Sequence, residues 1–373
     1  MIYLDSAATS LLKPSEVHSA VLDAMKTMAS PGRGSHAPAE KAAETAFECR
    51  CLLADLFHVP EPEQVVFTMN ATHGLNIAIL SMIKPGDRVV VSGYEHNAVM
   101  RPLQLAGAQV DVAASPLFDA EAAVEAFAKR IPGAAAVVCN HVSNVFGFIL
   151  PIDAIAALCR EHGVPLIIDA SQSAGVIGID FTSLGARFMA MPGHKGLMGP
   201  QGTGVLICSG QVRPLMAGGT GSNSRSADMP DFLPDRLEAG THNITGIAGL
   251  MAGAKYIKRL GTVRIEEYER KLMGLMRDAL SKIPGLTVYA AQNPEMQTGV
   301  LSVKHEKHGC EAVAEALGAR GVAVRAGMHC APSAHESAGT LAEGTVRFSF
   351  SPFNTQAEVS TAAAITNRIL KTL

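Results

Sequence analysis

Two stretches decide the predicted fold: Leu166-Ile167-Ile168-Asp169-Ala170-Ser171-Gln172, and Gly193-His194-Lys195, which follows it. The first is a short apolar run ending in a carboxylate, which predicts a buried strand of a mostly parallel sheet. Lys195 follows the next apolar run, 188–191, in a segment rich in glycine and proline that disfavours a regular helix. Because ligands of such sheets bind beyond the carboxyl ends of the strands, we expect Asp169 and Lys195 in one site.

The surrounding sequence alternates short apolar runs with helical patterns. Helical stretches such as 153–162, which Gly163 and Pro165 terminate, separate the apolar runs. Strand–helix alternation of this kind is typical of a doubly wound α/β domain. We predict a mostly parallel sheet of seven strands at 65–68, 89–92, 110–113, 135–140, 166–169, 188–191 and 204–208.

The pattern changes after about residue 255. A charged helix over 263–283 precedes strand candidates at 286–290, 300–303, 322–325 and 346–349, with a helix over 310–318. A capping box at 355–358 opens a last helix that is expected to run nearly to Leu373. We therefore expect a large α/β domain of residues 15–255 and a smaller α+β domain of residues 1–14 and 256–373. The glycine- and serine-rich stretch 217–226 is the best candidate for a mobile loop or an intersubunit arm.

The bulk composition excludes several classes of function. The chain has 373 residues, 48% of them apolar, and a net charge of −3 without basic blocks, so nucleic acid is not an expected partner. The sequence has neither a secretory signal nor an apolar run of the ~18 residues that a membrane span needs, which indicates a cytoplasmic protein. Seven scattered cysteines indicate reduced thiols. His305, His308 and Cys310 approach metal-ligand spacing, but without a second cluster we expect no metal site.

Asp169 and Lys195 together indicate one kind of chemistry. A carboxylate at a strand end can face a pyridinium nitrogen, and a lysine can form a Schiff base with an aldehyde. Alone, the aspartate would be a turn residue and the lysine a surface charge. Their separation of 26 residues and the glycine-rich flank of Lys195 favour a site for pyridoxal 5'-phosphate.

The sequence around this pair resembles the class V (NifS-like) aminotransferase family. The family's motifs occur in order from residue 3 to residue 354, at 3–9, 70–72, 95–98, 143–147, 169–175, 193–195 and 238–241. Arg325-Ala326-Gly327-Met328-His329-Cys330 is similar to the cysteine loop of group II (SUF-type) cysteine desulfurases and selenocysteine lyases. The resemblance implies the fold type I of pyridoxal phosphate-dependent transferases, which is aspartate aminotransferase-like.

The resemblance also implies roles for particular residues. It makes Lys195 the covalent anchor of the cofactor, and His96 the ring that stacks on the pyridine and shuttles protons. Gln172 and Asn144 would contact the edge of the cofactor that carries its phenolate oxygen. The expected phosphate ligands are Ala71, Thr72, His194 and, from the neighbouring subunit of a homodimer, Thr241.

Three positions depart from the family pattern. Pro192 replaces a serine that usually binds phosphate, and proline offers neither a hydroxyl nor an N–H. Met328 stands where group II enzymes commonly have histidine, and Ser6 stands where asparagine is usual. These departures indicate a divergent subgroup.

The implied reaction is the conversion of L-cysteine to L-alanine with a persulfide formed on Cys330. Arg347 would grip the substrate carboxylate with its two-pronged guanidinium, and His36 and Arg33 would border the substrate site. Cys330 is expected in an exposed loop, where His329 and Arg325 favour its thiolate. The sulfur would pass to an acceptor protein or thiol, as in iron–sulfur cluster assembly.

Two alternatives stay open at this point. The same fold and cofactor would serve a selenocysteine lyase acting on L-selenocysteine, or another lyase, transaminase or epimerase of the family. A non-catalytic scaffold or sulfur-relay protein is the second alternative. The retention of Lys195, Asp169, His96, Gln172 and Arg347 argues against it.

Overall fold

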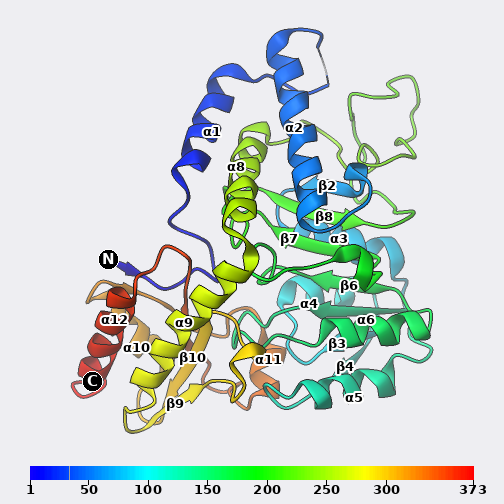
Figure 1. Ribbon diagram of the computed structural model, residues 1–373. Coiled ribbons are helices and arrows are strands. Elements are labelled where there is room, and N and C mark those ends of the chain that lie inside the picture. The colour runs from blue at the N-terminus through cyan, green and yellow to red at the C-terminus, as the bar shows by residue number, and fades with distance from the viewer. Residues whose placement is uncertain (33) are drawn as a thin grey trace.

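The computed structural model describes residues 1–32 and 34–373, and its centre is a seven-stranded sheet (Figure 1). The strand order is β2-β8-β7-β6-β5-β3-β4. β8 runs antiparallel to both of its neighbours, and the other adjacent pairs are parallel. The strands confirm the seven predicted runs to within one residue: β2 Val65–Thr68, β3 Arg88–Ser92, β4 Gln109–Ala113, β5 Ala136–Asn140, β6 Leu166–Asp169, β7 Phe188–Pro192 and β8 Gly204–Cys208.

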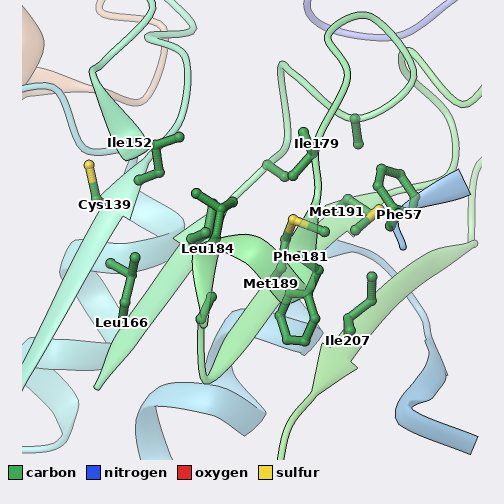
Figure 2. Packing of buried hydrophobic residues seen from close by; sticks show 14 of the residues in the cluster. Phe57, Cys139, Ile152, Leu166, Ile179, Phe181, Leu184, Met189, Met191 and Ile207 are labelled. Carbon is green, nitrogen blue, oxygen red and sulfur yellow. The ribbon is translucent and has the colours of Figure 1, made fainter. Parts of the chain in front are cut away.

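Helices cover both faces of this sheet, which explains the continuous apolar runs. Neighbouring residues of one strand point to opposite faces. Ile168 thus joins a core cluster with the end of α2 (Ala37–Leu56), α5 (Ala120–Arg130), α6 (Ile152–Glu161) and α7 (Phe181–Leu184). Ile167 joins the opposite cluster, under α3 (Ala71–Met82) and α4 (Asn97–Leu105). Figure 2 shows the first cluster, where Leu166, Met189 and Ile207 pack with Phe181.

A glycine brings one long helix onto the segment that carries Lys195. α8 (Ile244–Leu260) packs between α1 (Ser15–Thr27) and α2 (Figure 1). A Cβ added at Gly253 of α8 would lie 2.3 Å from the backbone oxygen of Leu197. Only a glycine therefore allows this contact, which holds the backbone just after Lys195.

The C-terminal third builds a second sheet beside the first. Its antiparallel order is β12-β13-β10-β9, with β9 Leu286–Tyr289, β10 Val300–His305, β12 Arg325–Gly327 and β13 Thr345–Ser349. The helices of this part are α9 Thr262–Leu280, α10 Cys310–Gly318, α11 Pro332–Ser337 and α12 Gln356–Ile369, and short 3₁₀ turns span Pro62–Gln64 and Pro294–Met296. Leu4, Leu272 and Phe348 belong to one apolar cluster, so the N-terminal segment packs with this sheet. The division into domains at 14/15 and 255/256 stays a prediction.

One predicted strand of this region is wrong. Residues 322–325 do not form a single strand, because β11 (Val322–Ala323) pairs with the N-terminal β1 (Ile2–Tyr3), whereas β12 pairs with β13. The chain changes sheets between them. The capping box at Thr355 is confirmed, but α12 ends at Ile369. No helix in the described residues combines the length and apolar character that a membrane crossing requires.

Candidate active site

A cavity of about 540 Å³ lies at the carboxyl ends of β5, β6 and β7. Its walls come from the starts of α3 and α4 and from the ends and following loops of these strands, which are distant in sequence. This is the edge at which ligands of open α/β sheets bind. The lining residues are Asn70, Ala71, Thr72, His96, Ala98, Asn140, Val142, Asn144, Asp169, Ser171, Gln172, Pro192, His194 and Lys195.

Asp169 and Lys195 both line this cavity, as the sequence predicts. Asp169 is buried, and its Oδ1 accepts a hydrogen bond from the backbone N–H of Ser171 at 2.9 Å. Burial lowers the pKa of the Lys195 ammonium from 10.5 to about 8, while Asp169 opposes that shift. Roughly a tenth of Lys195 is therefore a neutral amine at pH 7 and about half at pH 8, and this is the form that attacks an aldehyde.

His96 is held at the start of α4. Its Nδ1 accepts a hydrogen bond from the backbone N–H of Ala98 at 3.0 Å. Burial is the main cause that lowers the pKa of the imidazole, and the nearby carboxylate of Asp169 opposes it. The ring is therefore neutral at neutral pH, and its proton lies on Nε2 because Nδ1 is an acceptor.

Asn144 and Gln172 are fixed by backbone partners at the cavity wall. Asn144 Nδ2 donates to the backbone oxygen of His329 at 2.8 Å, and Gln172 Nε2 donates to that of Ala7 at 3.0 Å. Within the described residues, Asn144 Oδ1 is buried without a hydrogen-bond partner. Such an oxygen indicates a donor that a bound molecule supplies.

The opposite wall is suited to an anion. α3 begins at Ala71, after the N-cap Asn70, so the first backbone N–H groups of the helix lie at the cavity wall. His194 also lines it, and its Nδ1 lies 3.0 Å from Thr9 Oγ1. Pro192 lines the same wall, which leaves Thr72, His194 and the helix N–H groups as the donors on this side.

Arg347 is buried beside the cavity, and part of its guanidinium already has hydrogen-bond partners in the protein. Its Nη1 donates to the backbone oxygen of Asn144 at 2.8 Å, and its Nη2 lies 2.7 Å from Asp5 Oδ1. Arg347 Nε is buried without a partner in the described part of the chain. The guanidinium is thus held in place, and three of its five N–H groups, including that of Nε, remain for a ligand.

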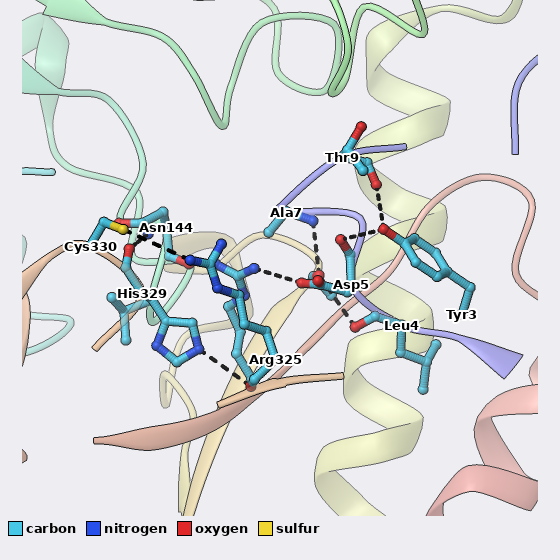
Figure 3. Close-up of polar contacts among 12 residues, drawn as sticks. Tyr3, Leu4, Asp5, Ala7, Thr9, Asn144, Arg325, His329 and Cys330 are labelled. Carbon is cyan, nitrogen blue, oxygen red and sulfur yellow. Dashed lines mark hydrogen bonds and ion pairs between the residues drawn. The ribbon is translucent and has the colours of Figure 1, made fainter. Parts of the chain in front are cut away.

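Cys330 lies in a tightly held turn next to the cavity. Of the seven cysteines, all within the described residues, only Cys330 is exposed. Its backbone oxygen accepts from Asn97 N at 2.8 Å, and the preceding carbonyl of His329 accepts from Asn144. His329 and Cys330 adopt φ values of 50° and 56°, which are uncommon for residues other than glycine. Figure 3 shows Asn144, His329 and Cys330 gathered at this turn.

The other cysteines fit a structural role better. Burial raises the pKa of the Cys49 and Cys159 thiols to about 12 and that of Cys139 well above its ordinary value. Cys208 is fully buried as well. Because the thiolate is the nucleophile, these thiols are unreactive at neutral pH.

The prediction of an exposed loop around Cys330 is wrong in part. Residues 332–337 form the short helix α11, and His335 is fully buried, with Nδ1 2.7 Å from Thr340 Oγ1. The His329 ring stacks on His335 at 5.8 Å between centroids. Burial lowers the pKa of His329 to about 2, so this imidazole is neutral and brings no charge to Cys330. Arg325 does approach the thiol, with Nη2 3.8 Å from Sγ.

Two of the predicted site residues do not line the cavity of their own chain, and the structure does not describe a third. Thr241 lines separate cavities together with Gly240 and His242. His36 is an exposed residue at the N-terminal end of α2. Arg33 lies outside the described residues.

Two acidic residues of the site region had no predicted role. Asp5, in the N-terminal segment, holds the guanidinium of Arg347. Glu95 is fully buried, and its Oε1 accepts from Ser92 Oγ at 2.6 Å and from Asn140 N at 2.8 Å. Burial raises the pKa of Glu95 to about 8, so this carboxyl is neutral at neutral pH. It joins the ends of β3 and β5 below the cavity.

Comparison with known proteins agrees with this site. The family described as Aminotransferase class-V matches residues 2–361. The chain is 32% identical over 395 residues to a probable cysteine desulfurase from Pyrococcus abyssi, covering 100% of this chain and 95% of the relative. It is also 32% identical to a cysteine desulfurase from Klebsiella pneumoniae, covering 100% and 94% of the two chains.

Solved structures show the same relationship. The apo structure of a cysteine desulfurase from Thermococcus onnurineus superposes with a TM-score of 0.91 at 32% identity, covering 100% of this chain and 95% of that one. The chain therefore belongs to the class V aminotransferase family. Within that family, its fold is the one that the cysteine desulfurases adopt.

The cavity fits the cofactor of this family, pyridoxal 5'-phosphate. A buried carboxylate, a lysine with a lowered pKa and a neutral imidazole stand around it, with the start of α3 on the phosphate side. The unpartnered Asn144 Oδ1 offers a further polar contact. Each of these groups matches a distinct part of the cofactor: ring nitrogen, aldehyde, ring face and phosphate.

Proposed function

We propose that this protein is a pyridoxal phosphate-dependent cysteine desulfurase that converts L-cysteine to L-alanine. The observation that carries the proposal is the position of Cys330. It is the exposed cysteine, and hydrogen bonds to Asn97 and Asn144 hold its turn beside the cavity that contains Asp169 and Lys195. A selenocysteine lyase would use the same framework, but no feature of the site favours it.

In this proposal the cofactor, when bound, withdraws electrons from the substrate Cα. Lys195 Nζ anchors it and moves the Cα proton, and Asp169 holds its ring nitrogen in the charged form. His96, neutral at neutral pH, covers the ring and exchanges protons with the substrate. Ala71, Thr72 and His194 hold the phosphate, and Gln172 and Asn144 contact the edge with the phenolate oxygen.

The sulfur transfer itself involves Cys330. Its thiolate attacks the sulfur of the substrate, so an S–S bond forms while the Cβ–S bond breaks and Cβ gains a proton. Cys330 ends as a persulfide, which a second thiol or an acceptor protein then reduces. Arg325, 3.8 Å from Sγ, favours the thiolate form.

The test of this proposal is the site of the transferred sulfur. The purified protein is incubated with L-cysteine without reductant and digested, and the peptide containing Cys330 is examined by mass spectrometry. We expect that peptide to gain the mass of one sulfur atom, and the gain to disappear on reduction. Sulfur found on Cys51 or Cys310, with none on Cys330, would contradict the assignment.

Arg347 is expected to bind the substrate carboxylate. Loss of its charge-assisted contact in a desolvated site should cost about 2–4 kcal/mol, roughly 30- to 700-fold in KM. Arg347→Ala should therefore raise KM for L-cysteine strongly and keep the absorbance of the bound cofactor. Arg347→Lys is the matched control, because it keeps a cation beside Asp5 but cannot make the two-pronged contact of a guanidinium with a carboxylate. An unchanged KM in Arg347→Ala would rule out this role.

We further propose that the protein is a homodimer with composite sites. Thr241 lies outside the cavity of its own chain, and the family resemblance implies that this residue completes the phosphate site of the neighbouring subunit. Exposed apolar side chains occur in the same regions, including Phe47, Met69 and Met216. Such side chains are typical of a covered surface.

Mixed dimers test the composite site. Thr241→Ala alone should weaken cofactor binding by about 10-fold, because a hydrogen bond to a charged group is lost. In a dimer of one Lys195→Ala and one Thr241→Ala subunit, one site then has both residues, so at a cofactor concentration too low to fill the Thr241→Ala sites its activity should exceed that of either parent dimer. Mixed dimers no more active than the Thr241→Ala parent would show that Thr241 acts within its own chain.

The proposed reaction requires a compartment in which cysteines stay reduced. All seven cysteines are free, and the reaction needs Cys330 as a thiol at the start of each turnover. We therefore place the protein in the cytoplasm, with sulfur supply for processes such as iron–sulfur cluster assembly as its use.

A further inference from the structure

A second cavity adjoins the first at Lys195. It has a volume of about 450 Å³ and shares Ser171, Gln172 and Lys195 with the cavity assigned to the cofactor. Its far wall is built by Glu269 of α9 and by Thr298 and Gly299 before β10. We refer to it as the rear chamber.

Glu269 is the acidic residue among those that line the rear chamber. It is 6% exposed, and within the described residues no hydrogen bond contributes to its pKa. A Cβ at Gly299 would lie 2.7 Å from Glu269 Cβ, so the side chain packs directly on the backbone of residue 299. Glu269 is therefore a mostly buried carboxyl on the wall of a cavity that Lys195 also lines.

The carboxyl is mostly protonated at pH 7 and about half ionised near pH 8. Burial is the main cause that raises the pKa of Glu269 from 4.5 to about 8, and the charge of Glu266, one turn earlier on α9, is a smaller cause. Arg270 pairs with Glu266 rather than with Glu269. Across the chamber the titratable group is Lys195, and no charged residue of α8, β10 or α12 lines the chamber. Lys195 has a pKa of about 8 as well, so a proton can pass between the two groups with little change in free energy.

The lining of the rear chamber is part polar and part apolar. Ser6, Ser10 and Ser351 bring hydroxyl groups to the wall, in addition to Thr298 and Gln172, whereas Val176, Met198, Val300 and Phe350 line it with apolar groups. Water molecules need two to four polar partners, and the polar part of the wall supplies them.

We propose that Glu269 and the water of the rear chamber form a proton relay for Lys195. Lys195 Nζ takes a proton from the substrate and passes it through water to the Glu269 carboxylate. Glu269 later returns a proton to solvent or to Nζ, and no bonds other than N–H and O–H change. The proposal rests on the proposed function, because it assumes that Lys195 moves the substrate proton.

Glu269→Gln tests the relay, since it keeps the shape of the side chain and cannot change protonation state. We expect kcat at pH 8 to fall by about 10- to 100-fold, the range of general acid–base effects. The rise of kcat with pH near 8 should also become shallower, because Glu269 and Lys195 both lose a proton there in the wild type and only Lys195 does so in the variant. Glu267→Gln is the matched control, because this exposed residue of α9 lies outside the chamber and does not contribute to the raised pKa of Glu269, so kcat and its pH dependence should not change.

Stability and spectroscopy test the raised pKa on which the relay depends. A carboxyl with a raised folded-state pKa stabilises the native state less as pH rises from 4.5 to 8. Glu269→Gln should therefore gain Tm relative to wild type as pH is raised from 5 to 8, and a Tm difference that does not change with pH would contradict the raised pKa. Infrared spectra should show a protonated carboxyl band that titrates near pH 8 and is absent in Glu269→Gln.

The results for Lys195→Ala and Glu269→Gln together distinguish the relay proposal from the proposed function on which it rests. An active Lys195→Ala protein would contradict the proposed function itself. If Lys195→Ala is inactive while Glu269→Gln keeps the kcat and pH profile of wild type, the relay alone is wrong.

Discussion

Lys195→Ala should abolish turnover of L-cysteine, with kcat lower by at least about 1,000-fold. The lysine combines two roles in this account, covalent anchor and proton carrier, and general acid–base catalysis alone contributes 10²–10⁴-fold. The side chain is also partly buried in the cavity that Asp169 lines, and within the described residues no other lysine lines this cavity.

A chemical readout makes this expectation specific. Borohydride reduction of the wild-type protein should link the cofactor covalently to the peptide that contains Lys195. In Lys195→Ala the reduced protein should carry no covalent cofactor, although some cofactor still binds through the phosphate side. Lys13→Ala is the control, because this partly buried lysine bonds Ser10 and does not line the cofactor cavity. A borohydride-reducible linkage at another lysine would refute the assignment.

Cys330→Ala should bind cofactor and substrate normally and lose sulfide release from L-cysteine. The exposed thiol is the group that accepts the substrate sulfur, and the buried thiols are unreactive because burial raises their pKa. We expect a loss of at least about 100-fold, as for removal of a nucleophile. L-Selenocysteine should keep part of its turnover, because selenium leaves more readily than sulfur.

The matched control for this variant is Cys310→Ala. Cys310 is partly exposed, but it lies at the start of α10 and does not line the cavity. Its Sγ donates a hydrogen bond to the backbone oxygen of Glu343. This variant should keep full activity. Full desulfuration of L-cysteine by Cys330→Ala would show that the turn at Cys330 has another role.

The central sheet was predictable because burial on both faces leaves a local signature. Strands such as 166–169 and 204–208 are continuous apolar runs, and the structure gives the same bounds. Residues 322–325 are an exception, because their sequence resembles a single strand but β11 and β12 pair with strands of different sheets. Pairing with β1 or β13 depends on segments far away in the sequence, which no local pattern reveals.

The site was predictable only where family motifs or strand ends mark it. The cavity gathers Asp169, Lys195, His96, Gln172, Asn144, Thr72 and His194 from separate motifs. The partner of Arg347 was not predictable, since Asp5 precedes it by 342 positions and reaches it only through the packing of the N-terminal segment. Burial of His335 was missed for a similar reason: a run of polar residues resembles an exposed loop, whereas here its imidazole packs against His329.

The most direct test of the central claim is a product assay with purified protein, pyridoxal 5'-phosphate and L-cysteine. Alanine and sulfide are measured together, with and without a thiol reductant. The account predicts equal amounts of alanine and sulfide with reductant over many turnovers, and about one alanine per site without it, because the persulfide on Cys330 then remains. Absence of alanine in both conditions, or release of sulfide with pyruvate and ammonia instead of alanine, would contradict it.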